Sequence, residues 1–242
     1  MSDSSSPACW PARLPVDHLP SIGRPRAAND SERVLTLLRL LVLVTTTCVA
    51  LAADSPRIVY IKSFPGSTPA YVEITIDSSG AVTYKETADD DPETFKLEPD
   101  STAQIFSLAA KLDHFSHPIE SGLKIANMGA KTFRWEDGDK KAEVKFNYSI
   151  DENAKALHDW FERITETERL VVIFRRAVRH DKLGVNESLL NIQTAWEKKR
   201  ISGAAQFLPL LDQVAQNDTY MHMARERAAQ LGDAIRAKSK AE

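Results

Sequence analysis

The sequence predicts an α+β fold, in which an antiparallel sheet with the order hairpin, helix, hairpin, helix is followed by a small C-terminal helical bundle. Two segments, residues 57–86 and 131–150, alternate apolar and polar residues around short polar turns, which is typical of antiparallel hairpins. From residue 151 onwards, apolar residues recur at the three- and four-residue spacing of amphipathic helices. Strands and helices do not alternate as repeated β-α-β units, and this favours α+β over a parallel sheet.

The first hairpin is predicted within RIVYIKSFPGSTPAYVEITIDSSGAVTYKE, residues 57–86. The turn DSSG at residues 77–80 suits a hairpin, because Gly80 is free to adopt a positive φ. The strand before it alternates cleanly, so one side of the sheet is apolar and the other polar. The apolar side is expected to carry Val72, Ile74 and Ile76, and the side away from the helices Tyr71, Thr75, Arg134 and Lys145.

A helix is expected between the two hairpins, and Asp100 or Ser101 is placed to cap it. The segment 123–129 is then expected to form a short strand, and Asp137-Gly138 the turn of the second hairpin. The apolar face of the helix is expected to consist of Ile105, Leu108, Ala109 and Leu112.

Four helices are predicted after Asp151. Asn186 is expected to cap the second, Pro209 to lie in the first turns of the third, and Asn217-Asp218 to begin the last. The apolar stripe of the first helix is Leu157, Trp160, Phe161, Ile164, Val171, Phe174 and Val178, and that of the last is Met221, Ala224, Ala228, Leu231 and Ile235.

The N-terminal region predicts export. Leu40–Ala53 is an uncharged run of 14 residues that ends in Ala-Leu-Ala, the pattern of a secretory signal peptide, so residues 34–53 are interpreted as a signal that is cleaved after Ala52. The alternative is an inner-membrane anchor formed by residues 34–53, although a spanning helix usually needs about 20 apolar residues. Residues 1–33 are interpreted as a disordered leader or as the result of a mis-assigned translation start.

Two parts are expected in the exported chain: residues 54–150 as a β-rich α+β domain, and residues 151–242 as a helical region that packs on it or follows it. The 242 residues carry a net charge of -3, which excludes a strongly basic nucleic-acid-binding surface. The protein is therefore expected to bind no nucleic acid, and a membrane only if the N-terminal segment is retained.

The motifs of common enzymes are absent from the sequence, which contains no His-Glu-x-x-His, no Gly-x-Ser-x-Gly and no phosphate-binding loop. Both cysteines, Cys9 and Cys48, precede the expected cleavage site, so no thiol chemistry is expected after export. No catalytic, cofactor-binding or metal-binding residue is therefore predicted.

Several polar clusters are alternatives to the prediction that the chain has no catalytic or metal-binding residue. His114 and His117 are spaced to share a metal, but Pro118 follows and no third ligand is evident, so a solvated helix end is preferred. Asp89–Asp91 lacks the alternating pattern of a calcium loop. His158 and Glu162, one helical turn apart, are interpreted as surface or packing residues. The aromatic residues Trp135, Trp160, Trp196, Tyr148 and Tyr220 are expected in the core rather than along a groove.

One turn is the candidate interaction site: Pro65, Gly66, Ser67, Thr68 and Pro69, with Tyr71 just beyond it. The stretch FPGSTPAYVEITIDSSGAVTYK resembles a bacterial family of exported domains of unknown function, which carries a Cys-x-Gly-x-Cys-Pro-x-Tyr turn before such a hairpin. Phe64 and Thr68 stand where that family has its cysteines, so the resemblance implies no redox role here. Ser67 beside Gly66 is interpreted as a turn residue rather than a nucleophile, and the turn itself is interpreted mainly as a structural corner.

The order of hairpins and helices is also similar to that of emfourin-type inhibitors of thermolysin-like proteases, in pattern only. The expected function is that of a non-enzymatic extracytoplasmic interaction or structural module, with an extracytoplasmic protein as its partner. The alternative is an inhibitor of a secreted metalloprotease.

Overall fold

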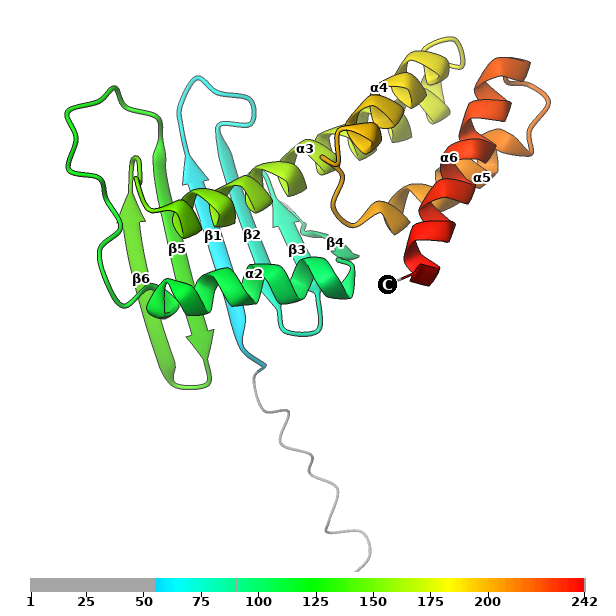
Figure 1. Ribbon diagram of the computed structural model, residues 1–242. Coiled ribbons are helices and arrows are strands. Elements are labelled where there is room, and N and C mark those ends of the chain that lie inside the picture. Colours follow the sequence, from blue (N-terminus) through cyan, green and yellow to red (C-terminus); the bar gives the residue numbers. More distant parts are fainter. Residues whose placement is uncertain (1–54, 90, 242) are drawn as a thin grey trace, which may run out of the picture. The chain divides into compact units, whose positions relative to one another are not determined.

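A single antiparallel sheet organises the first half of the computed structural model, which describes residues 55–89 and 91–241. Its strand order is β4-β3-β2-β1-β5-β6, and every neighbouring pair is antiparallel (Figure 1). The expected α+β class with an antiparallel sheet and a helical C-terminal part is confirmed. The strands are β1 (Arg57–Ser63), β2 (Tyr71–Asp77), β3 (Ala81–Lys85), β4 (Glu93–Lys96), β5 (Ala130–Asp137) and β6 (Lys140–Phe146).

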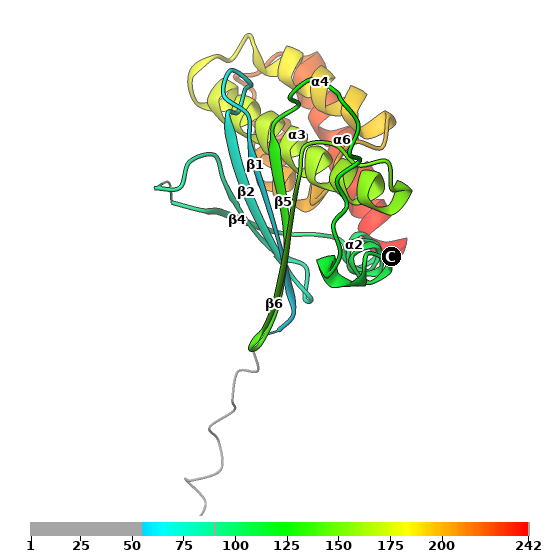
Figure 2. The same ribbon diagram turned by 90° about the vertical axis from the view of Figure 1, so that its left-hand side faces the viewer.

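Helices lie on one face of this sheet, and none of the described helices covers the other, which is called the open face (Figure 2). The open face carries alternating charges: Arg134 pairs with Glu143 at 2.7 Å, and Lys145 pairs with the same carboxylate at 3.2 Å. The expected polar side of the sheet is thus confirmed. The helical elements are α2 (Pro99–Lys111), the 3₁₀ turn η1 (Asp113–Phe115), α3 (Glu152–His180), α4 (Val185–Glu197), the 3₁₀ turn η2 (Ala204–Phe207), α5 (Leu208–Ala215) and α6 (His222–Ala241).

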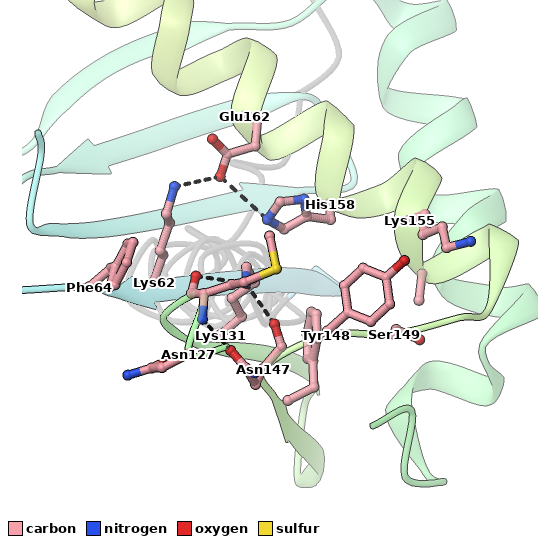
Figure 3. A pocket seen from close by; sticks show the side chains of 13 residues that line it. Lys62, Phe64, Asn127, Lys131, Asn147, Tyr148, Ser149, Lys155, His158 and Glu162 are labelled. Atoms are coloured by element: carbon pink, nitrogen blue, oxygen red, sulfur yellow. Dashed lines mark hydrogen bonds and ion pairs between the residues drawn. The ribbon is translucent and has the colours of Figure 1, made fainter. Parts of the chain in front are cut away.

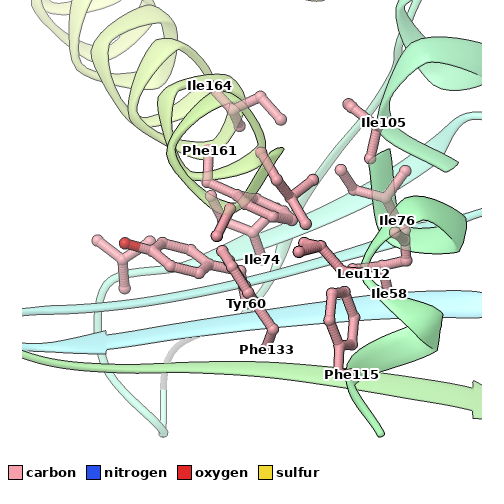
Figure 4. Close-up of a cluster of buried hydrophobic side chains, with 14 of the residues drawn as sticks. Ile58, Tyr60, Ile74, Ile76, Ile105, Leu112, Phe115, Phe133, Phe161 and Ile164 are labelled. Carbon is pink, nitrogen blue, oxygen red and sulfur yellow. The ribbon is translucent and has the colours of Figure 1, made fainter. Parts of the chain in front are cut away.

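The first hydrophobic core fills the space between the sheet, α2 and the N-terminal part of α3 (Figure 4). Tyr60 of β1 stacks on Phe161 of α3 with ring centroids 4.5 Å apart, and Phe133 of β5 lies 5.7 Å from Tyr60. Offset and tilted aromatic pairs of this kind stabilise a core beyond their buried area. Val72, Ile74 and Ile76 are fully buried here, as the alternation predicts.

A second core lies among the C-terminal part of α3 and α4, α5 and α6. The long helix α3, 29 residues and about 44 Å, contributes to both cores. Its expected apolar stripe is confirmed, except that Trp160 is only partly buried. Asp151 caps α3 by accepting hydrogen bonds from the backbone amides of Asn153 and Ala154.

The sequence misplaced two parts of the sheet. The segment 123–129 is not a strand, because Asn147 binds it as a loop; its amide group bonds both Met128 N–H and Ala126 C=O. Conversely, no strand is predicted from the sequence at β4. Its four residues have no apolar alternation, and they are extended because they pair with β3.

Three predicted helix starts are also wrong. Pro99, with its fixed φ, opens α2 after Glu98, so neither Asp100 nor Ser101 caps it. Gly184, not Asn186, precedes α4. The last helix begins at His222, because Asn217 uses its side chain in a local turn with Thr219.

Two further details concern the last helices. Pro209 lies in the first turn of α5, as expected. Met221 is exposed instead of belonging to the apolar stripe of α6.

The interpretations of residues 1–33 and 34–53, of Cys9 and Cys48, and of Asp90 lie outside the described residues. Within residues 55–89 and 91–241, none of the helices combines the length and the apolar character needed to cross a membrane.

Candidate functional site

Two lysines occupy inward-facing positions at one end of the sheet. Lys62 of β1 and Lys131 of β5 are direct cross-strand partners, in the same face as the buried pair Tyr60 and Phe133. Like charges placed opposite each other destabilise a sheet. The two lysines therefore lower the stability of the sheet at this end, where apolar residues would otherwise continue the alternation.

Helix α3 faces the two lysines with a histidine and a carboxylate one turn apart (Figure 3). Lys62 Nζ donates to Glu162 Oε1 at 2.8 Å, and Tyr60 Oη lies 3.4 Å from the same oxygen. His158 Nε2 lies 3.4 Å from it as well, but it makes no hydrogen bond and is shielded from solvent. His158 Nε2 thus lies within ion-pair distance of Glu162 but makes no hydrogen bond.

Lys131 organises the neighbouring loop. Its side chain is only 6% exposed, and Nζ contacts the carbonyl oxygens of Met128 at 3.1 Å, Gly129 at 3.4 Å and Asn147 at 2.8 Å. Gly129 is required where this loop passes β1, because its φ is +92° and a Cβ there would lie 2.8 Å from the Cβ of Phe64.

A cavity of about 440 Å³ opens between these elements, within the size range of small-ligand sites. Its walls combine the charged cluster with apolar and aromatic surface from the end of β1, the 127–128 segment, the β6–α3 connection and α3. The apolar and aromatic residues are Phe64, Met128, Phe146, Tyr148 and Ala154.

The electrostatic balance of the cavity favours an anion. Burial lowers the pKa of Lys131, and the nearby Lys62 lowers it further, while three carbonyl contacts suit the protonated amine. Burial also lowers the pKa of His158; the charge of Glu162 opposes this shift, and Lys131 and Lys62 add to it. Against these two cations stands one carboxylate, Glu162. A third cation, Lys155, lines the cavity and pairs with Glu152 at 2.8 Å.

Exposed apolar side chains surround the same end of the molecule. Ser121 N–H donates to Tyr148 C=O at 2.8 Å, so the 121–128 loop is held against the β6–α3 connection at both of its ends. Large apolar side chains protrude from these two segments: Leu123 is 56% exposed, Ile125 39%, Met128 50% and Ile150 59%. Exposed apolar groups that gather beside a polar cavity are typical of interaction sites.

The candidate interaction turn lies beside this cavity but does not line it. Within the turn, Ser67 Oγ lies 2.8 Å from Phe64 C=O and 2.6 Å from Pro69 C=O, which makes it a turn residue as predicted. Gly66 has φ +90°, and Tyr71 donates to Glu73 at 2.6 Å. Only Phe64, which precedes the turn, reaches the cavity wall.

The other candidate clusters are not brought together. His117 pairs with Asp113 at 3.1 Å on the surface, while His114 packs on Trp135 with ring centroids 4.4 Å apart. Within the described part of the chain, no group of three metal-ligating side chains is present. Of the aromatic residues expected in the core, Tyr220 is buried, whereas Tyr148 lines the cavity and Trp160 and Trp196 line a separate groove.

Lys62, Lys131, His158 and Glu162 are the residues that the sequence did not identify as a site. His158 and Glu162 were interpreted as surface or packing residues, but they face the cavity. The available signal was a lysine at an inward position of an otherwise apolar alternation, as in Ile58, Tyr60, Lys62. Its meaning depends on which strand lies next to β1, and local patterns do not show this.

Comparison with known proteins adds no assignment. No protein-family model matches the sequence, and no curated protein matches it. The resemblance to exported domains and the similarity in pattern to emfourin-type inhibitors therefore stay predictions.

Proposed function

We propose that the protein is an exported, non-enzymatic binding module, and that its ligand is a segment of an extracytoplasmic partner protein that carries a carboxylate among apolar side chains. The observation that carries this proposal is the pairing of Lys62 with Lys131 on the inward face of the sheet, beside an open cavity. Export is part of the proposal and depends on the signal pattern of residues 34–53.

Charge supports a carboxylate ligand. Lys62 is already paired with Glu162, and an incoming carboxylate can accept a hydrogen bond from the same ammonium group, which has three donors. Nε2 of His158, which makes no hydrogen bond, offers a further contact in the tautomer that carries its proton on this atom. Hydrogen bonds to a charged group are worth more than neutral ones, so a buried carboxylate is recognised strongly.

The exposed apolar side chains support a polypeptide segment rather than a free ion. Leu123, Ile125 and Met128 stand on a loop that Asn147 and Lys131 hold in place, so contact with a partner requires little ordering of this loop. Preorganisation reduces the entropic cost of binding. A small inorganic anion would leave these side chains in water.

The arrangement favours binding over catalysis. Glu162 Oε1 is contacted by Tyr60, Lys62 and His158. The amine of Lys131 is engaged by backbone carbonyl oxygens, so it is not placed to act as a nucleophile. Ser149, the serine in the cavity wall, accepts a hydrogen bond from Asp151 N–H at 3.2 Å, and no described side chain that could act as a base is hydrogen-bonded to it. Nucleophilic catalysis needs such a base.

Fluorescence with 8-anilinonaphthalene-1-sulfonate, an aromatic anion, tests the site directly. We expect this probe to bind, and Lys62→Met to weaken it about tenfold, as for the loss of one charged hydrogen bond. Lys145→Met is the matched control, because that lysine lies in the β5–β6 hairpin, as Lys131 does, but faces the open side of the sheet. Equal affinities of the two variants would contradict the assignment of the cavity.

The peptide part of the proposal is tested by displacement of the bound probe. Acetyl-Leu-Glu-Leu-amide is expected to displace it at a lower concentration than acetyl-Leu-Gln-Leu-amide, because only the first carries a carboxylate. If both peptides act alike, or neither acts, the ligand is not an acidic apolar segment.

A further inference from the structure

A second hollow, which shares no lining residue with the cavity, crosses the helical part of the molecule. Two depressions of about 470 and 610 Å³ meet at Trp196 and Lys238, which line both of them. One extends along the connection between β4 and α2 towards α6, and the other lies between the start of α2, α3 and the end of α4. Together they make up one groove, with Trp196 and Lys238 where they meet.

Two tryptophans present their rings to this groove. Trp160 and Trp196 are each packed against a hydrophobic core, one against the first and one against the second. Arg163 Cζ lies 4.7 Å from the centroid of the Trp160 ring, and Lys238 Nζ lies 5.6 Å from that of Trp196. The π-face of an indole attracts positive charge, and the partially positive C–H groups of a pyranose ring stack on it for the same reason.

Positive charge predominates along the groove. Six cationic side chains line it, against three carboxylates, Glu98, Asp100 and Glu197. Arg163 and Arg236 are held in ion pairs with Asp159 and Asp212. In the part of the chain that the structure describes, Lys96, Lys199 and Lys240 make no ion pair within 4 Å.

We propose that this groove binds an acidic oligosaccharide, a linear chain of uronic-acid residues. Its pyranose rings stack on Trp160 and Trp196 as the side chains of Arg163 and Lys238 move aside from the two indoles. Its carboxylates then pair with these cations and with the lysines of the groove, and its hydroxyl groups donate to Asp100 and Glu197. Aromatic rings with cations also bind single-stranded nucleic acid. The three carboxylates of the groove favour the sugar chain, because each uronic-acid residue offers hydroxyl groups that donate hydrogen bonds to them, whereas single-stranded DNA offers none along its chain.

Isothermal titration of the full chain with hexagalacturonate tests the proposal. We expect a dissociation constant below about 1 mM, and about tenfold weaker binding of Lys238→Ala. Lys182→Ala is the matched control, because Lys182 also stands over an aromatic ring, that of Tyr220 at 6.0 Å, outside the groove. Trp196→Ala is expected to abolish binding, and Lys199→Gly, which removes a charge at a position suited to glycine, to weaken it in a folded protein.

Three results would overturn the proposal: no binding of hexagalacturonate at millimolar concentration, equal binding by Lys238→Ala and Lys182→Ala, or equal binding of the neutral hexasaccharide maltohexaose. A thymidylate dodecamer that bound more tightly than hexagalacturonate would assign the groove to nucleic acid instead. The proposed peptide site is independent of these outcomes, because Lys62→Met leaves the groove unchanged.

Discussion

Gln206 Nε2 donates a hydrogen bond of 2.7 Å to Glu168 Oε1, and this bond joins the middle of α3 to η2. Glu168 is only 2% exposed and lies between the last residue of the first core, Ile164, and the first of the second, Val171. Thr167 beside it accepts a hydrogen bond from Ser202 N–H at 3.1 Å. A polar layer therefore separates the two cores along one helix.

Glu168 is expected to make stability depend on pH. The pKa of Glu168 is raised to about 7. Burial is the main cause, and the negative charges of Glu93 and Glu86 raise it further. The Gln206 hydrogen bond and the positive charge of Arg175 act in the opposite direction. A raised pKa means that the folded state holds the proton more tightly than the unfolded state. Its contribution to stability is thus fully present below about pH 4.5 and is lost as the pH rises through about 7.

Glu168→Gln removes the charge and keeps an acceptor for Gln206. We expect this variant to be more stable than the natural sequence at pH 8, by about 3 kcal/mol, and equally stable at pH 4.5. Urea unfolding at the two pH values measures the difference. Glu187→Gln, at an exposed position of α4, is the control and should show no such pH dependence. A gain at pH 8 no larger than that of the control would refute the buried-charge account.

Lys199 ends α4 in a conformation that favours glycine. Its φ is +56°, and the bonds Lys199 N–H to Trp196 C=O and Arg200 N–H to Ala195 C=O close the helix end around it. Lys199→Gly is expected to raise the free energy of unfolding by about 0.5–1 kcal/mol, because glycine adopts this φ without a steric cost. Thermal unfolding detects the change, and Lys198→Gly, with φ -79°, should instead lower stability.

Glu98 connects the sheet end to the helical bundle. Its carboxylate accepts from Gly203 N–H at 3.0 Å and from Ala204 N–H at 2.9 Å. Glu98→Ala is expected to lower the free energy of unfolding by about 2 kcal/mol, because two backbone donors lose a charged acceptor. Glu93→Ala is the comparison, since its pair with Arg175 is exposed and should cost less than about 1 kcal/mol. Similar losses for both variants in urea unfolding would argue against this role of Glu98.

Much of the fold follows from local patterns. The alternation of Val72, Ile74 and Ile76 predicted a strand with one buried side, and the turn glycines Gly80 and Gly138 adopt the positive φ that their turns require. The order of hairpins and helices was sufficient to predict the α+β class. Where the local pattern is weak, the prediction is wrong. β4 is extended only because it pairs with β3, and the 123–129 segment is a loop because Asn147 binds it, although its sequence suggests a strand.

The sequence by itself thus determined the class of the fold, most of its elements and part of each hydrophobic core, because these depend on the spacing of apolar residues over short distances. Only the tertiary structure decided where a site forms. The register of β1 against β5 places Lys62 opposite Lys131, 69 positions apart, and α3 then brings His158 and Glu162 over them. Such contacts depend on which strands are neighbours and in which register they pair, and periodicity within one strand carries no information about either.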